Sequence, residues 1–237
     1  MTDSSIITYV DAALAQLRRE DLMRWPGRLP DEMRDPSVVP SSGWVGWRAI
    51  PSTVGDADLD ALERETKLAF PPLYREFLKY RHFVTLTERG LRFERHLNQG
   101  WRENLRRIYF ASWPRARIVD IGLLPFGSES QMDAGPVCFD TRHRTADGDC
   151  PIVFWDHEWV DTVSEVRPMF SSTAKMFQCL MAFASTDVNF MSHDEDDACS
   201  SLPLKRALLA DFLAMDPAGA GGPARSYWTS WGVDAAG

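Results

Sequence analysis

The chain has 237 residues, with 34 acidic against 26 basic side chains, a net charge of -8 and a pI near 5.1. Hydrophobic residues make up 44% and charged residues 25%, a balance typical of folded globular proteins and not of disordered ones. The negative charge would repel a phosphate backbone, so we expect no direct binding of nucleic acid.

The sequence carries no pattern typical of a membrane protein or a secreted protein. No run of about 18 apolar residues occurs, and residues 1–6 lack a basic region followed by an apolar one. The cysteines form no Cys-x-x-Cys pair and suit a reducing compartment; they are Cys138, Cys150, Cys179 and Cys199. We therefore expect a cytoplasmic protein without a membrane span.

The first predicted element is a helix over residues 4–19. Ile7, Val10, Leu14 and Leu17 recur at spacings of three and four, which indicates one buried helical face. The helix is expected to end before the Trp-Pro-Gly sequence that follows it, because proline and glycine interrupt helical structure.

A connector and two short helices are predicted next. Residues 26–43 have the proline and glycine density of an irregular connector, which Trp44 and Trp47 would hold on the body of the protein. Aspartates at its start favour a helix over residues 56–67, and paired prolines suit the first turn of another over residues 71–78.

The middle of the chain is predicted to form a sheet. Residues 84–93 indicate strands, whereas residues 97–110 carry both helical and extended signals. Further strands separated by turn-forming residues are predicted over residues 117–124, 136–140, 152–155 and 159–163. Short links between such strands favour an antiparallel meander.

The C-terminal third is predicted to be mostly helical. Ser171 or Ser172 can cap a helix whose apolar side would lie on the sheet, and another helix is expected over residues 202–215. The glycine-rich stretch 218–223 is a flexible spacer by composition. The aromatic residues after it are expected to dock on the domain or on a partner; they are Tyr227, Trp228 and Trp231.

One cluster of ionisable residues could serve catalysis. Asp156, His157 and Glu158, with His143, offer zinc ligands or a general base. However, neighbours on a strand point to opposite faces, and no His-Glu-x-x-His pair stands nearby. A solvated turn or a partner contact is the favoured interpretation, so we expect no catalytic residues, no metal and no cofactor.

The acidic segment over residues 193–197 has the oxygen ligands that calcium prefers. It lacks the alternating aspartates, central glycine and terminal glutamate of an EF-hand loop. A solvated loop is the favoured interpretation, and mimicry of phosphate charge toward a basic protein is the alternative.

An ordered series of short patterns runs through the centre of the chain. It comprises residues 51–63, 68–78, 123–127, 135–140, 151–158 and 171–180, and includes Leu124-Pro125-Phe126-Gly127 and Cys138-Phe139-Asp140. In this order the patterns resemble the SMI1/KNR4 domain, also called the SUKH superfamily. Two departures are the Tyr80-Arg81-His82-Phe83 sequence, which replaces a frequent asparagine-glycine, and a long insertion between His82 and Ile118.

The resemblance implies an α+β fold, with helices packed on a mostly antiparallel sheet and helical extensions at both ends. We expect an N-terminal helix and connector over residues 1–49, the SMI1/KNR4-like domain over residues 50–186, and a C-terminal part over residues 187–237. That part comprises the acidic loop, a helix and the aromatic tail, packed on the same domain.

Bacterial members of this superfamily are largely immunity proteins, which bind and block a toxin, often a nuclease. The resemblance and the acidic charge together imply a non-catalytic immunity protein for a basic toxin, acting as a monomer or a homodimer. The alternatives are an intracellular regulatory adaptor and, ranked last, a metal-dependent hydrolase. The predicted contact surface comprises Trp155, Asp156, His157, Glu158 and Trp159, with Glu129 and Asp133 from a neighbouring loop.

Overall fold

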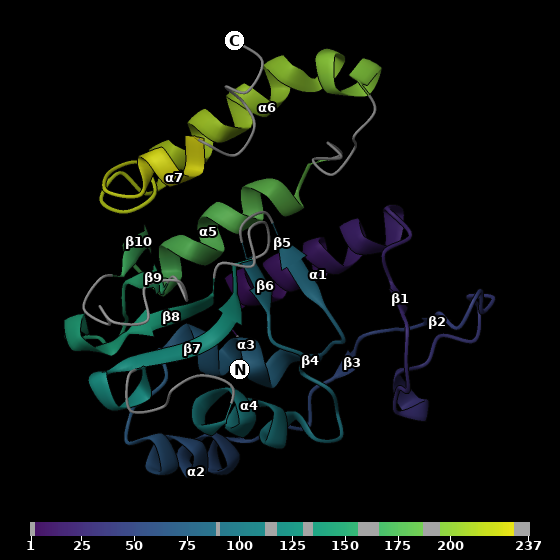
Figure 1. Ribbon diagram of the computed structural model, residues 1–237, viewed down its shortest axis with the longest axis horizontal. Coiled ribbons are helices and arrows are strands. Elements are labelled where there is room, and N and C mark those ends of the chain that lie inside the picture. The colour runs from purple at the N-terminus through teal and green to yellow at the C-terminus, as the bar shows by residue number, and fades with distance from the viewer. Residues whose placement is uncertain are drawn as a thin grey trace.

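The computed structural model describes residues 3–88, 91–111, 118–129, 135–155, 166–186 and 195–229. The fold is α+β, as predicted (Figure 1). The helices are α1 Ser4–Arg19, α2 Asp56–Thr66, α3 Pro72–Tyr80, α4 Trp101–Phe110, α5 Thr173–Ala184, α6 Glu195–Met215 and α7 Arg225–Thr229. The strands are β1 Arg24–Trp25, β2 Val45–Gly46, β3 Ile50–Pro51, β4 Arg81–His82, β5 Leu86–Glu88, β6 Leu91–Phe93, β7 Leu123–Ser128, β8 Pro136–Asp140, β9 Ile152–Phe154 and β10 Arg167–Phe170. No helix in these described ranges is both long and apolar enough to cross a membrane.

The main sheet has six strands in the order β10-β9-β8-β7-β6-β5, and every neighbouring pair is antiparallel. Strand order therefore follows chain order, which confirms the predicted meander. The register places Phe139 opposite Ile152 and Val153 opposite Pro168. A bulge between Pro125 and Gly127 interrupts the β7 and β8 pairing.

Both faces of this sheet are apolar, and alternation along each strand divides its residues between two clusters. The inner face contributes to the main core, which α1, α3 and α5 cover; it carries Leu124, Phe126, Val137, Phe139, Ile152 and Phe154. The opposite face, here called the outer face, carries the smaller cluster of Leu123, Cys138, Val153, Trp155 and the nearby Ile118.

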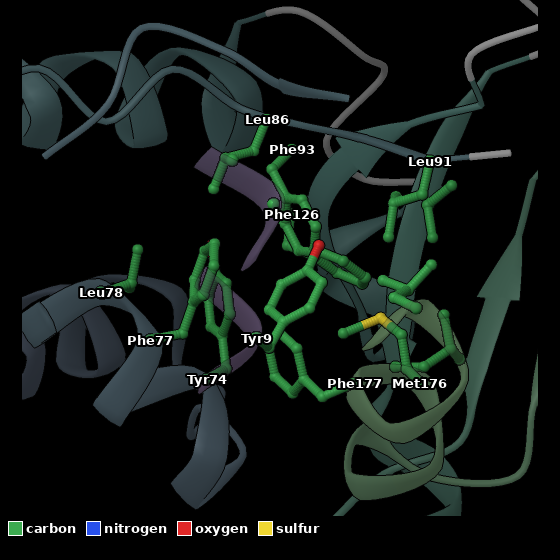
Figure 2. Packing of buried hydrophobic residues seen from close by; sticks show 14 of the residues in the cluster. Tyr9, Tyr74, Phe77, Leu78, Leu86, Leu91, Phe93, Phe126, Met176 and Phe177 are labelled. Atoms are coloured by element: carbon green, nitrogen blue, oxygen red, sulfur yellow. The ribbon is translucent and has the colours of Figure 1, made fainter. Parts of the chain in front are cut away.

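Aromatic rings from four parts of the chain meet in the main core (Figure 2). Phe126 and Phe139 on adjacent strands stack with centroids 4.1 Å apart. Phe77 of α3 lies 5.5 Å from Phe177 of α5, which lies 5.3 Å from Tyr9 of α1. The N-terminal helix is therefore an integral part of the core, since such ring contacts add to the stability gained from burial alone.

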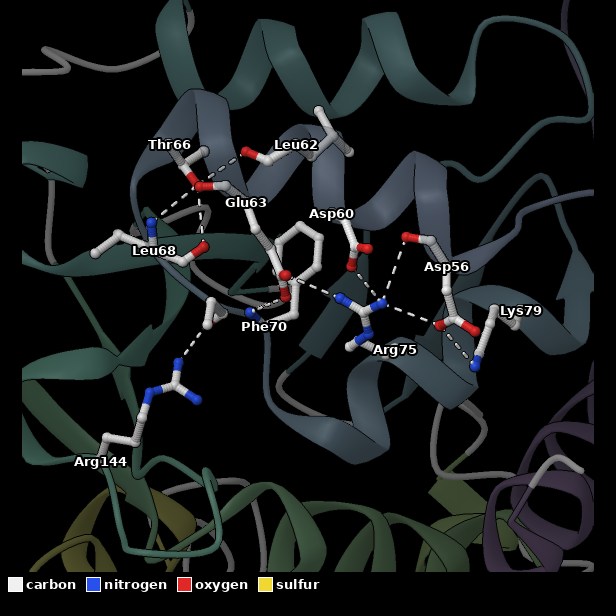
Figure 3. A network of polar contacts seen from close by, with 11 residues as sticks. Asp56, Asp60, Leu62, Glu63, Thr66, Leu68, Phe70, Arg75, Lys79 and Arg144 are labelled. Carbon is white, nitrogen blue, oxygen red and sulfur yellow. Dashed lines mark hydrogen bonds and ion pairs between the residues drawn. The ribbon is translucent and has the colours of Figure 1, made fainter.

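The α2 and α3 helices are joined by a polar network around Arg75 (Figure 3). Its guanidinium lies 2.8 Å from Glu63 and from Asp60, and 3.0 Å from Asp56. Glu63 also accepts a 2.7 Å hydrogen bond from the backbone of Phe70 in the link between the helices. The network fixes the angle between the two predicted helices, because one planar fork satisfies several carboxylates.

The helices α6 and α7 of the C-terminal part pack against α5 and the end of the main sheet. Ser172 caps α5 by accepting a hydrogen bond from the Lys175 amide, and α6 lies along α5 on the side away from the sheet (Figure 1). Trp228 of α7 is buried between Phe170 and Phe212, and its Nε1–H donates to the Met169 carbonyl at 3.1 Å. This bond satisfies a carbonyl on β10, an edge strand of the sheet.

The glycine-rich stretch after α6 is a compact turn, so the prediction of a flexible spacer is wrong. The buried Asp216 carboxylate accepts hydrogen bonds from the amides of Ser171 at 2.8 Å, Gly219 at 3.1 Å and Ala220 at 3.2 Å. A Cβ on Gly219 would lie 2.2 Å from the Ser171 nitrogen, so glycine is needed for close backbone approach. The composition of residues 218–223 could not predict this turn, because the carboxylate that stabilises it belongs to Asp216, outside the stretch.

Three further expectations are corrected or refined. The strand predicted over residues 117–124 begins only at Leu123, because a short 3-10 helix, η3 Val119–Ile121, precedes it. Within the ambiguous residues 97–110, Trp101–Phe110 form α4. Trp47 is buried and anchors the connector, whereas Trp44 remains 44% exposed. The strand predicted over residues 159–163 lies outside the described residues.

Replacing the buried carboxylate that holds the C-terminal turn should destabilise the protein. Asp216→Ala removes the acceptor of several backbone amides and leaves them buried without a partner. The expected loss is about 3 kcal/mol in the free energy of unfolding. Urea denaturation measures it, with Asp211→Ala on the exposed side of α6 as the control. Equal stability of the two variants would contradict this account.

A buried histidine pair should make the fold sensitive to mild acid. The Thr53 amide donates to Nε2 of His82, and His96 donates from Nε2 to the Leu78 carbonyl at 2.8 Å. Burial, with a smaller effect of neighbouring His82, lowers the pKa of His96 from 6.5 to about 3. Between pH 6.5 and about 3, the unfolded chain therefore binds a proton at His96 that the folded chain does not bind. The free energy of unfolding falls as the pH drops below 6.5 for this reason.

His96→Gln tests the direction of this pH dependence, because glutamine keeps a donor for the Leu78 carbonyl but does not titrate. Between pH 7 and pH 5, the wild-type free energy of unfolding should fall by about 2 kcal/mol more than that of the variant. Urea denaturation at both values measures the difference, and parallel losses in the two proteins would disprove a neutral His96.

Candidate functional site

Two of the predicted contact residues lie in the described part of the chain, and both are buried. Trp155 is 1% exposed and belongs to the outer-face cluster. Glu129 is 0% exposed and accepts a 3.0 Å hydrogen bond from the Tyr227 hydroxyl. Neither side chain is presented to a partner in this structure. The remaining predicted contacts, Asp133, Asp156, His157, Glu158 and Trp159, lie outside the described residues.

An open groove of about 690 Å³ lies on the outer face at the β10 end of the sheet. Its floor is mostly apolar and includes Val153, Val166 and Pro168. One wall is formed by Arg142 and His143, which belong to the short 3-10 helix η4 Thr141–His143 after β8. The opposite wall is formed by Ala218 and Gly219 of the turn after α6. The groove therefore joins segments about 75 residues apart in the chain.

A buried carboxylate organises the first wall. Asp140, the last residue of β8, accepts bonds from Nε and Nη2 of Arg142 at 2.7 and 2.8 Å, and from Nδ1 of His143 at 3.0 Å. Burial opposes ionisation of Asp140, but these hydrogen bonds outweigh it and hold the pKa of its carboxyl below the usual value. The same ion pair raises the pKa of Arg142. This geometry fixes both side chains at the groove.

The absence of a side chain at Gly122 leaves space for the side chain of Arg142. Gly122 has a φ of +91°, and a Cβ there would lie 2.9 Å from Cγ of Arg142. The Gly122 carbonyl accepts hydrogen bonds from both the amide and the hydroxyl of Thr141, at 2.9 and 2.7 Å. The turn before β7 and the turn after β8 are thus joined by these two hydrogen bonds, which helps to position Arg142.

The second wall depends on Asp216. Its carboxylate bonds to the amides of Ser171 and Gly219, and so ties the groove-lining turn to the end of β10. A short Ser171 hydroxyl contact at 2.5 Å adds to the same attachment. Because α6 also packs on α5, this wall is fixed to the main body at two points.

The groove presents polar side chains beside an apolar floor. The side chain of His143 is 69% exposed, and that of Arg142 is 32% exposed. In the ranges that the structure describes, no three His, Cys, Asp or Glu side chains are grouped as metal ligands would be. A pair of hydrogen-bonding side chains beside an apolar floor is typical of protein surfaces that bind polypeptide segments.

Sequence reasoning missed most of this groove. His143 was grouped with Asp156, His157 and Glu158 as a candidate zinc ligand or general base. In the structure its hydrogen-bond partner is Asp140, which the sequence had not associated with it. The Asp-x-Arg-His order after a predicted strand was a usable signal for a side-chain clamp. Pro168 and Gly219 carried no such signal, since only the tertiary fold brings them to the same place.

Comparison with known proteins identifies the family. The family model described as SMI1 / KNR4 family (SUKH-1) matches residues 53–178, which is more than half of the chain. The matched part runs from just before α2 into α5 and holds all six strands of the main sheet, whereas α1, α6 and α7 lie outside it. A search of curated proteins gives no match. The chain therefore belongs to the SMI1/KNR4 family (SUKH-1).

Proposed function

We propose that this protein is an immunity protein that binds a cognate protein toxin in the cytoplasm and blocks it without catalysis. The family is known for immunity proteins, which supports the proposal. The single structural observation that carries it is the open groove on the outer face, with a rigid polar wall beside an apolar floor. Stoichiometric occlusion of the toxin's active site or of a neighbouring surface is the proposed mechanism.

The charge of the chain supports a basic partner, such as a nuclease toxin. A net charge of -8 speeds the encounter with a positively charged protein, and this effect weakens with salt. Residues 156–165 stand in the sequence between β9 and β10, two strands that line the groove. We propose that the predicted contacts among them, Asp156, His157, Glu158 and Trp159, extend the surface that the groove begins, together with Asp133.

The experiment combines identification of the partner with rescue of growth. The tagged full-length chain is captured from its native cell at moderate salt, and the protein that remains bound at one-to-one ratio is identified by mass spectrometry. That partner is then expressed alone and together with the chain in a host that lacks both. We expect growth arrest with the partner alone and recovery on co-expression.

Pro168→Glu should weaken this protection, because it places a charge on the exposed apolar floor of the groove. The expected change is an increase of at least about tenfold in the Kd for the captured partner. Thr87→Glu, exposed on β5 at the other edge of the sheet, is the matched control and should protect like the wild type. Capture of regulatory proteins that do not affect growth would favour an adaptor and overturn the immunity proposal.

A further inference from the structure

We propose that Arg142, which Asp140 holds in place beside His143, is a preformed receptor for an acidic side chain of the partner, with apolar residues beside that side chain occupying the groove floor. The inference rests on the proposed function only in taking a partner protein as the occupant. It adds the chemistry that the groove recognises, namely an aspartate or glutamate within an extended apolar segment. Its basis is the geometry of the two side chains around Asp140.

The first step is the division of donors on Arg142. The Asp140 carboxylate occupies Nε and one hydrogen of Nη2, in a bidentate ion pair. The guanidinium carries five N–H donors, so Nη1 and the outer hydrogen of Nη2 remain on the side away from Asp140. Among the described residues, no hydrogen bond from Nη1 of Arg142 is formed. These donors match the spacing of a second carboxylate.

The second step is the orientation of His143. Its Nδ1 contacts Asp140, so Nε2 is the nitrogen that points away from the buried carboxylate. The side chain is largely exposed and lines the groove beside Arg142. One buried carboxylate thus holds both side chains beside the groove floor, and the donors left for a second carboxylate are those of Arg142.

The third step is rigidity. A long arginine side chain ordinarily loses rotamer freedom when it binds, which reduces affinity. Here the Asp140 ion pair and the passage of Cγ beside Gly122 have already removed that freedom. Binding through this ordered guanidinium therefore costs less conformational entropy than binding through a mobile surface arginine.

The fourth step selects an acidic side chain over a free C-terminus. The cavity is an open groove, floored by Val153, Val166 and Pro168, and it passes between two walls. A chain can lie along such a groove and continue on both sides, whereas capture of a C-terminus uses convergent backbone amides. The negative net charge is compatible with this contact, because long-range attraction governs encounter and local pairing governs the bound state.

Short acetylated peptides test the inference without any toxin. The full-length ¹⁵N-labelled chain is titrated with Ac-Leu-Asp-Leu-NH2, with the neutral Ac-Leu-Asn-Leu-NH2, and with Ac-Leu-Leu-OH, whose only carboxylate is terminal. We expect saturable shifts of the Val153, Ser171 and Gly219 amides with the aspartate peptide. Its Kd should be about tenfold lower than that of either other peptide.

Arg142→Gln should abolish the preference for aspartate over asparagine while leaving weak apolar binding. If that variant fails to fold because Asp140 loses its partner, Arg142→Lys replaces it, since lysine keeps the charge but not the fork. Equal binding of the aspartate and asparagine peptides to the wild type would overturn the inference. So would preference for the free C-terminus, absence of binding, or shifts confined to other parts of the chain.

The growth rescue tests the immunity function and the peptide titration tests the acidic-side-chain receptor, so either proposal can be wrong without the other. A partner that is neutralised while the peptides show no aspartate preference leaves the immunity function intact and removes the acidic-side-chain receptor. A clear aspartate preference with no toxic partner retains the receptor and removes the immunity function.

Discussion

An antiparallel sheet with two apolar faces is the constraint on which the rest of this structure depends. Such sheets can leave one face in water, but β7, β8 and β9 are buried at nearly every position. Helices from both ends of the chain cover the inner face, so α1 is bound into the same core as α5. The outer face carries its own smaller cluster and, at the β10 end, the open groove. The site is therefore a consequence of how the second face is covered.

Two buried carboxylates hold the opposite walls of that groove by related chemistry. Asp140 bonds to the Arg142 amide and guanidinium, and Asp216 bonds to the amides of Gly219 and Ser171. Each carboxylate fixes a turn that would otherwise have many conformations, because several donors share one rigid acceptor. The first wall belongs to the part that the family model matches, and the second to the C-terminal extension beyond it. The groove thus unites the family fold with a feature outside the matched range.

The sequence predicted those parts of the fold that local patterns determine. Helical periodicity predicted the helix over residues 4–19, the paired prolines predicted the start of α3, and the strand pattern predicted β8. Features that depend on distant partners could not be read locally. The stretch 218–223 looks flexible until Asp216 is known to be buried beneath it, and Trp155 looks like a surface residue until the outer-face cluster is seen. For the same reason Arg142 and Pro168 could not be assigned to one site, although the family and the α+β class could be recognised.

The central claim is that the outer-face groove is the surface on which this protein binds its partner. Hydrogen–deuterium exchange of the full-length chain, with and without the captured partner, tests it most directly, since it reports protection along the whole backbone. The account predicts slower exchange in residues 151–153, 166–171 and 218–220, which line or support the groove. Protection confined to β5, α2 or α4, with the groove segments unchanged, would contradict it.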